Sequence, residues 1–145
     1  MDVQVGDKAP GSCNDRPMRT CIVVAFLALG AGCKAKLGGD LTVDGKPFTL
    51  DSCRSGQAFG FSGVDLLDPD GKKLRLVVNP NGTGAAIVFP PGATVGEEVG
   101  PCGPLTVTAQ NSTINSIKNV EGSATLDCTR GAHAIKGSVT FENCH

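Results

Sequence analysis

Residues 120–144 read VEGSATLDCTRGAHAIKGSVTFENC and consist of two similar halves. Residues 120–128 align with residues 135–143, and the matched pairs are Gly122 with Gly137, Ser123 with Ser138, Thr125 with Thr140, and Leu126 with Phe141. Apolar and polar residues alternate in both halves, which is the period of a strand with one buried face. The segment between them, TRGAHA, contains a glycine, so the stretch predicts a β-hairpin that turns near Arg130.

Strand and turn signals recur upstream of this hairpin. The turn signals are DG at 44–45, DPDG at 68–71 and NPNG at 79–82, and apolar alternation flanks each of them. LTVTA at 105–109 alternates in the same way, and no stretch after residue 40 has a sustained helical period. The sequence therefore predicts an all-β domain over residues 41–145, built as a small antiparallel β-sandwich or a partly open barrel and stapled by disulfides.

Composition limits the classes of partner. The chain has 13 basic and 14 acidic residues, a net charge of -1, so no strongly basic surface for nucleic acid is expected. It has no Trp and no Tyr, and therefore lacks the usual platforms on which sugars and bases stack. We expect no nucleic-acid partner.

Seven cysteines in 145 residues indicate export to an oxidising compartment. None of them has the C-x-x-C spacing of a zinc or redox site, so no metal is expected. The four cysteines of the predicted domain allow three pairings, between which the sequence alone does not select. A hairpin turning near Arg130 separates Cys128 from Cys144, and we favour bonds from Cys53 to Cys144 and from Cys102 to Cys128.

The segment MRTCIVVAFLALGAGCK at 18–34 has the three parts of a secretory signal. Arg19 gives the positive start, residues 21–29 the apolar core, and residues 30–32 the small residues before a cut. The apolar run is too short to span a bilayer, and a buried core helix would leave the small residues unexplained. We predict a signal peptide over 18–32, and a non-native or disordered leader over the polar residues 1–17.

The end of this segment, LGAGC at 29–33, resembles the lipobox of bacterial lipoproteins. The resemblance implies cleavage before Cys33 and a diacylglycerol on its thiol, with fatty acids such as palmitate; no other cofactor is expected. It implies that residues 33–40 are the lipidated cysteine and a tether, since KAKLGGD is polar and contains glycine. Cleavage by the ordinary signal peptidase would instead leave a soluble protein.

The same resemblance implies a location at the cell envelope, with the protein anchored in a membrane and facing the periplasm or the cell exterior. A resemblance to enterobacterial lipoprotein sorting implies that Lys34, rather than aspartate, after the cysteine suits delivery to the outer membrane, if the host has one. LTVDGKPFTLDSC at 41–53 and IKGSVTFENC at 135–144 also resemble the mycobacterial lipoprotein antigens. Their mature part is a small disulfide-bearing β domain on a lipidated tether, which implies a surface-displayed module with no catalytic residues to carry over.

The sequence shows no complete catalytic motif. GFSGV at 60–64 lacks the last glycine of G-x-S-x-G, and Asp68-x-Asp70-Gly71 fits a hairpin turn better than a calcium loop. His133 lies in the predicted turn without a visible partner, so we expect a solvated loop residue. Phe59 and Phe61 belong to the glycine-bearing segment 54–63; we expect them to complete the core, and the alternative is a contact loop for a protein or lipid partner.

These observations predict a lipid-anchored, exported bacterial protein that is not an enzyme. Its expected role is a non-catalytic binding or structural module at the cell envelope, with an unidentified protein or envelope partner besides the membrane. Two alternatives remain open: a small secreted hydrolase using His133, and a carrier of an apolar ligand between its sheets.

Overall fold

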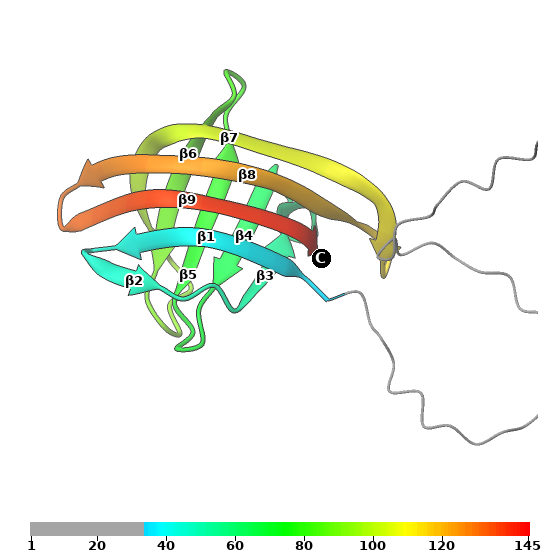
Figure 1. Ribbon diagram of the computed structural model, residues 1–145, viewed down its shortest axis with the longest axis horizontal. Helices are drawn as coiled ribbons and strands as arrows, with labels where there is room; N and C mark the ends of the chain where they lie inside the picture. Colours follow the sequence, from blue (N-terminus) through cyan, green and yellow to red (C-terminus); the bar gives the residue numbers. More distant parts are fainter. Residues whose placement is uncertain (1–33) are drawn as a thin grey trace, which may run out of the picture. The chain divides into compact units, whose positions relative to one another are not determined.

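The computed structural model describes residues 34–145 (Figure 1). The predictions for residues 1–17, residues 18–32 and Cys33 lie outside this range. The described chain forms β1 (Lys36–Val43), β2 (Lys46–Phe48), β3 (Ser52–Ser55), the 3₁₀ turn η1 (Gly56–Phe59), β4 (Gly63–Leu67), β5 (Lys73–Val78), β6 (Thr83–Phe89), β7 (Glu97–Ile114), β8 (Ile117–Arg130) and β9 (His133–Cys144). No helix within 34–145 is long and apolar enough to cross a membrane.

All nine strands belong to one antiparallel sheet in the order β2-β1-β9-β8-β7-β6-β5-β4-β3. The sheet curls into a half-barrel, which confirms the all-β prediction in its partly open barrel form. In Figure 1 the long strands β7, β8, β9 and β1 form a curved layer that crosses over β3 to β6. The edge strands β2 and β3 follow each other in the chain, so the open seam of the half-barrel lies between them.

Strand β7 belongs to both halves of the curled sheet. Its residues 97–104 pair with β6, and its residues 105–114 pair with β8. The pairing with β6 shifts register twice. Gly100 and Gly103 on β7 have backbone φ angles of 96° and 126°, which residues other than glycine rarely adopt. The bulged glycine-containing segment therefore lets one long strand bend from one half to the other.

The hairpin predicted from the internal repeat is present. β8 and β9 pair from Arg130 with His133 to Val120 with Cys144 around a turn at residues 131–132. The turns predicted at 44–45, 68–71 and 79–82 join β1 to β2, β4 to β5 and β5 to β6. The local turn and alternation signals were thus sufficient for the hairpins.

The predicted tether over 33–40 is too long, and the domain boundary at residue 41 is wrong. Strand β1 begins at Lys36, and its residues 36–40 pair with residues 138–142 of β9. Gly39 has a φ of 105°, and a Cβ there would collide with the carbonyl oxygen of Ser138. The glycine serves close strand approach rather than flexibility, and composition does not distinguish these two uses.

The core fills the inside of the curled sheet. Its buried apolar residues come from all nine strands: Leu41, Val43, Phe48, Cys53, Val64, Leu66, Leu74, Leu76, Ala86, Val88, Val99, Cys102, Leu105, Val120, Ala124, Leu126, Cys128, Ile135, Val139, Phe141 and Cys144. Both favoured disulfides are present within this core, Cys53 to Cys144 and Cys102 to Cys128. The first bond links the edge strand β3 to β9, which is on the other side of the seam.

Candidate functional site

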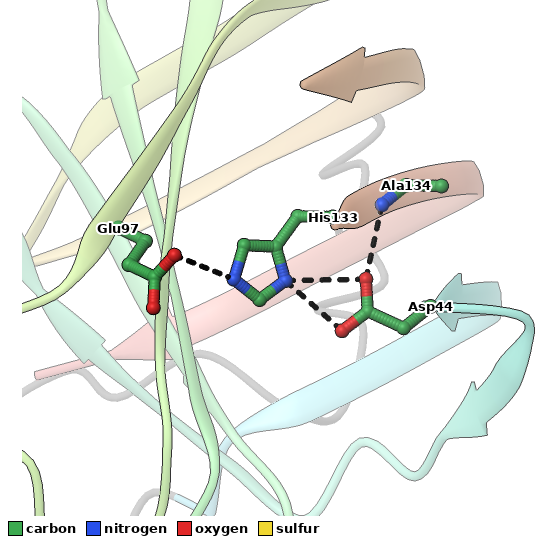
Figure 2. A network of polar contacts seen from close by, with 4 residues as sticks. All are labelled: Asp44, Glu97, His133 and Ala134. Carbon is green, nitrogen blue, oxygen red and sulfur yellow. Dashed lines mark hydrogen bonds and ion pairs between the residues drawn. The ribbon is translucent and has the colours of Figure 1, made fainter. Parts of the chain in front are cut away.

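His133 joins three strand ends (Figure 2). Its Nδ1 lies 3.0 and 3.2 Å from the two carboxylate oxygens of Asp44, in the turn between β1 and β2. Its Nε2 lies 3.2 Å from Oε2 of Glu97, the first residue of β7. Asp44 also accepts the backbone N–H of Ala134 at 3.0 Å. We call Asp44, Glu97 and His133 the histidine cluster.

The histidine cluster favours a charged imidazole. The hydrogen bond to Asp44 raises the pKa of His133 above 6.5, against a smaller opposing effect of burial, and the charges of Asp44 and Glu97 act in the same direction. Burial alone would raise the pKa of Asp44, but the hydrogen bonds from Ala134 and His133 hold it below 3.8. Because both ring nitrogens face carboxylates, the arrangement stabilises a doubly protonated ring rather than a free general base.

The expectation that His133 is a solvated loop residue without partners is wrong. Its side chain is only 16% exposed, and its two partners lie 89 and 36 residues away along the chain. No local sequence signal marks this contact, because it depends on how the end of β7 meets two turns of the sheet. In the sequence His133 stands between two alanines, Ala132 and Ala134, so its neighbours gave no indication of the contacts with Asp44 and Glu97.

The histidine cluster should make stability depend on pH. A raised pKa of His133 adds stability below 6.5 that is lost as the pH rises through the folded-state pKa. A lowered pKa of Asp44 adds stability above 3.8 that is lost as the pH falls through its folded-state pKa. Urea unfolding of the wild type and of His133→Gln should therefore differ most at mildly acidic pH, and the difference should shrink on going to about pH 9.

The control for this comparison is His145→Gln, which changes the exposed terminal histidine. It should follow the wild type over the whole pH range. A difference between wild type and His133→Gln that does not change with pH would contradict an ionic role for the cluster.

A second group of side chains lies on the outer face of the β4–β5 pair. Asp65 is 1% exposed although its neighbours Val64 and Leu66 point into the core, so it lies on the opposite side of β4. Arg75 is its direct cross-strand partner and donates from Nε to Oδ1 at 2.8 Å and from Nη2 to Oδ2 at 2.9 Å. This bidentate hydrogen bonding to the Asp65 carboxylate raises the pKa of Arg75 above its ordinary value.

Three phenylalanines surround this ion pair. The guanidinium carbon of Arg75 lies 4.2 Å from the ring centroid of Phe61, 5.3 Å from that of Phe89 and 5.8 Å from that of Phe59. The ammonium of Lys73 lies 4.0 Å from the Phe89 centroid. These distances allow cation–π attraction, and the rings shield the Asp65 to Arg75 pair from water.

The preferred expectation that Phe59 and Phe61 complete the core is wrong. Neither belongs to the interior cluster: Phe61 is half-buried over Gly56, where a Cβ would lie 2.6 Å from its ring, and Phe59 is 51% exposed. Ser55 caps η1 by accepting the N–H of Gln57 at 3.3 Å, and Gly60 ends η1 in the left-handed conformation. This short capped turn presents Phe59 to solvent, which fits the contact-loop alternative.

An open groove of about 540 Å³ lies across β7, β8, β9 and β1. Its middle is a row of hydroxyls, because Thr106 pairs with Ser123 and Ser123 pairs with Thr140. One border is the ion pair between Lys36 Nζ and Glu142 Oε1 at 3.1 Å. The groove was not predicted, since the row exists only when the register of three strands is known.

None of the sites contains an evident metal centre. Among residues 34–145 no group of three or more His, Cys, Asp or Glu side chains could hold a metal ion. Asp68 Oδ1 accepts the N–H of Lys72 at 2.8 Å, so this aspartate stabilises the turn between β4 and β5. Comparison with protein-family models, curated proteins and solved structures found no match to this chain.

Proposed function

We propose that this chain is a lipid-anchored, exported bacterial protein whose β domain is a non-catalytic binding or structural module at the cell envelope. The observation that carries the proposal is the position of the first strand relative to the lipobox-like segment. β1 begins at Lys36, so every described strand lies after a cut before Cys33. Cleavage and lipidation at Cys33 would remove none of the described fold.

The disulfides support export. Each bond joins cysteines that are buried and far apart in sequence, by 91 residues for Cys53 to Cys144 and by 26 for Cys102 to Cys128. Such bonds persist in oxidising compartments and are rare in the bacterial cytosol. An envelope location therefore agrees with both the lipobox and the cysteine usage.

The geometry favours a module over the alternatives of a hydrolase and a carrier. His133 lies beside an aspartate, as a hydrolase would need, but its second ring nitrogen faces Glu97. His133 is also not one of the residues that line the groove. Within residues 34–145, buried apolar side chains from all nine strands pack together inside the half-barrel, and a packed core favours the module over the carrier of an apolar ligand. The exposed Phe59 and the hydroxyl-lined groove are surfaces suited to contacts with a partner.

Fatty-acid labelling tests this proposal. The wild type, Cys33→Ser and Cys21→Ser are expressed in a bacterium with radiolabelled palmitate, and the cells are separated into soluble and membrane fractions. We expect wild type and Cys21→Ser to be labelled and membrane-bound, and Cys33→Ser to lose both properties. Cys21→Ser is the matched control because it lies in the apolar part of the predicted signal, outside the lipobox.

Retention of label and membrane association in Cys33→Ser would refute the lipoprotein proposal. In a host with two membranes, density-gradient separation of the labelled wild type should place it in the outer membrane, as expected from Lys34. The partner bound by the module can then be sought by crosslinking in intact cells.

A further inference from the structure

Several chain ends and turns meet at the end of the domain where β1 begins. Lys36 pairs with Glu142, and Cys144, two residues further on, is bonded to Cys53 of β3. η1 follows β3 directly, and Val120 pairs with Cys144, so residues 114–119 of the β7–β8 hairpin extend past the end of β9. We call this the anchor end; in Figure 1 it is on the right, with the C-terminus and the start of β1.

The opposite end is formed by the turns at 44–45 and 131–132. The histidine cluster lies there, because His133 follows one turn and Asp44 belongs to the other. Figure 1 shows these turns on the left, at the other end of the long strands. We call this the far end.

The anchor end combines apolar and basic side chains at the surface. Phe59 is 51% exposed, and Ile114 and Ile117 face each other, partly exposed, on either side of the hairpin turn. Lys34, Arg54 and Lys118 are exposed, and in the sequence they lie beside the start of β1, η1 and the hairpin turn. The partly exposed acidic residue Glu142 at this end is paired with Lys36. Aromatic and aliphatic groups flanked by basic residues fit the interface of a bilayer with anionic headgroups.

The chain between the lipobox cysteine and the domain is very short. Only Lys34 and Ala35 lie between Cys33 and the first residue of β1. Three residue steps reach at most about 11 Å even when fully extended. The polar layer on each side of a bilayer is roughly 5–8 Å thick, so a lipid on Cys33 would leave the domain little room to move away from the membrane.

We propose that the anchor end lies against the phospholipid bilayer that holds the lipid of Cys33, with Phe59 and the Ile114–Ile117 tip at the headgroup boundary. This inference rests on the proposed function, since it needs the lipid. The tether length brings this end to the bilayer, and its exposed apolar and basic groups match that environment. The far end, with the histidine cluster, then points away from the membrane.

Single tryptophans provide the test, because the chain has none of its own. Phe59→Trp and Ile117→Trp place the probe at the anchor end, and Ala132→Trp places it in the exposed far-end turn. Each full-length lipidated variant is reconstituted into phosphatidylcholine–phosphatidylglycerol vesicles with brominated acyl chains, which quench nearby tryptophan. We expect at least about twofold quenching for both anchor-end probes, while Ala132→Trp remains unquenched.

Vesicle flotation and the mass of the acylated protein are measured on the same samples. If the variants float but the anchor-end probes are quenched no more than Ala132→Trp, the orientation is refuted and the lipoprotein function stands. A blue-shifted but unquenched tryptophan would indicate burial against a second copy or another protein and would also refute it. If Cys33 carries no lipid, both this inference and the proposed function fail. Using two anchor-end probes guards against misfolding of one variant.

Discussion

Replacing Cys53 and Cys144 together by alanine is expected to lower the free energy of unfolding by about 4–5 kcal/mol. The bond closes a loop with a sequence separation of 91 residues, and a longer loop gives a larger entropy loss in the unfolded chain. It also holds β3, which pairs only with β4 at the edge of the sheet, to β9 across the open seam. Alanine is used because both positions are buried.

The matched comparison is the double alanine variant of Cys102 and Cys128. Its loop is shorter, with a separation of 26 residues, so the expected loss is about 3–4 kcal/mol. The bond also joins β7 and β8, which are already paired as neighbours. Urea unfolding measures the free energy of unfolding of both variants. A larger loss for the Cys102–Cys128 variant would contradict the view that the Cys53–Cys144 bond stabilises the fold by closing the seam.

Asp65→Asn is expected to lower the free energy of unfolding by about 2–3 kcal/mol. The change keeps the shape of the side chain but removes the charge that Arg75 and Lys73 face, at 2.8 and 3.8 Å. Arg75 is only 21% exposed and lies against Phe61, so it cannot replace the lost carboxylate fully with water. The expected loss is smaller than the roughly 3–5 kcal/mol of a fully buried pair because Arg75 keeps this partial contact with solvent.

Asp127→Asn is the control for this substitution. Asp127 is 78% exposed and lies 3.7 Å from Lys136 on the neighbouring strand, so its ion pair is screened by water. The change should alter stability by less than about 0.5 kcal/mol. If Asp65→Asn and Asp127→Asn lower the free energy of unfolding equally, the three phenylalanine rings do not strengthen the Asp65 to Arg75 ion pair by shielding it from water.

Several features of the fold could be predicted because they depend on neighbouring residues. Asp44-Gly45 and DPDG at 68–71 determine tight turns, and the alternation in residues 120–128 and 135–143 determines which side of each strand is apolar. The predicted hairpin also argued against a bond between Cys128 and Cys144, because the strands on either side of a turn near Arg130 hold these two cysteines far apart. The observed bonds follow that reasoning.

Other features depend on strand register and could not be predicted from the sequence. Composition predicted a tether at 34–40, yet pairing with β9 makes residues 36–40 part of the sheet. Scarce aromatics suggested buried Phe59 and Phe61, yet Arg75 holds Phe61 on the outer face and η1 exposes Phe59. In each case a long-range contact outweighed a local preference.

The sequence by itself determined the all-β class of the domain and its hairpins, because both are encoded by turn residues and by alternation within short stretches. Only the tertiary structure decided that the sheet curls once into a half-barrel, that His133 meets Asp44 and Glu97, and that the start of β1 lies at the same end as η1. The physical reason is that curling depends on bulges and twist accumulated over nine strands. Contacts between residues far apart in the chain follow from that curvature.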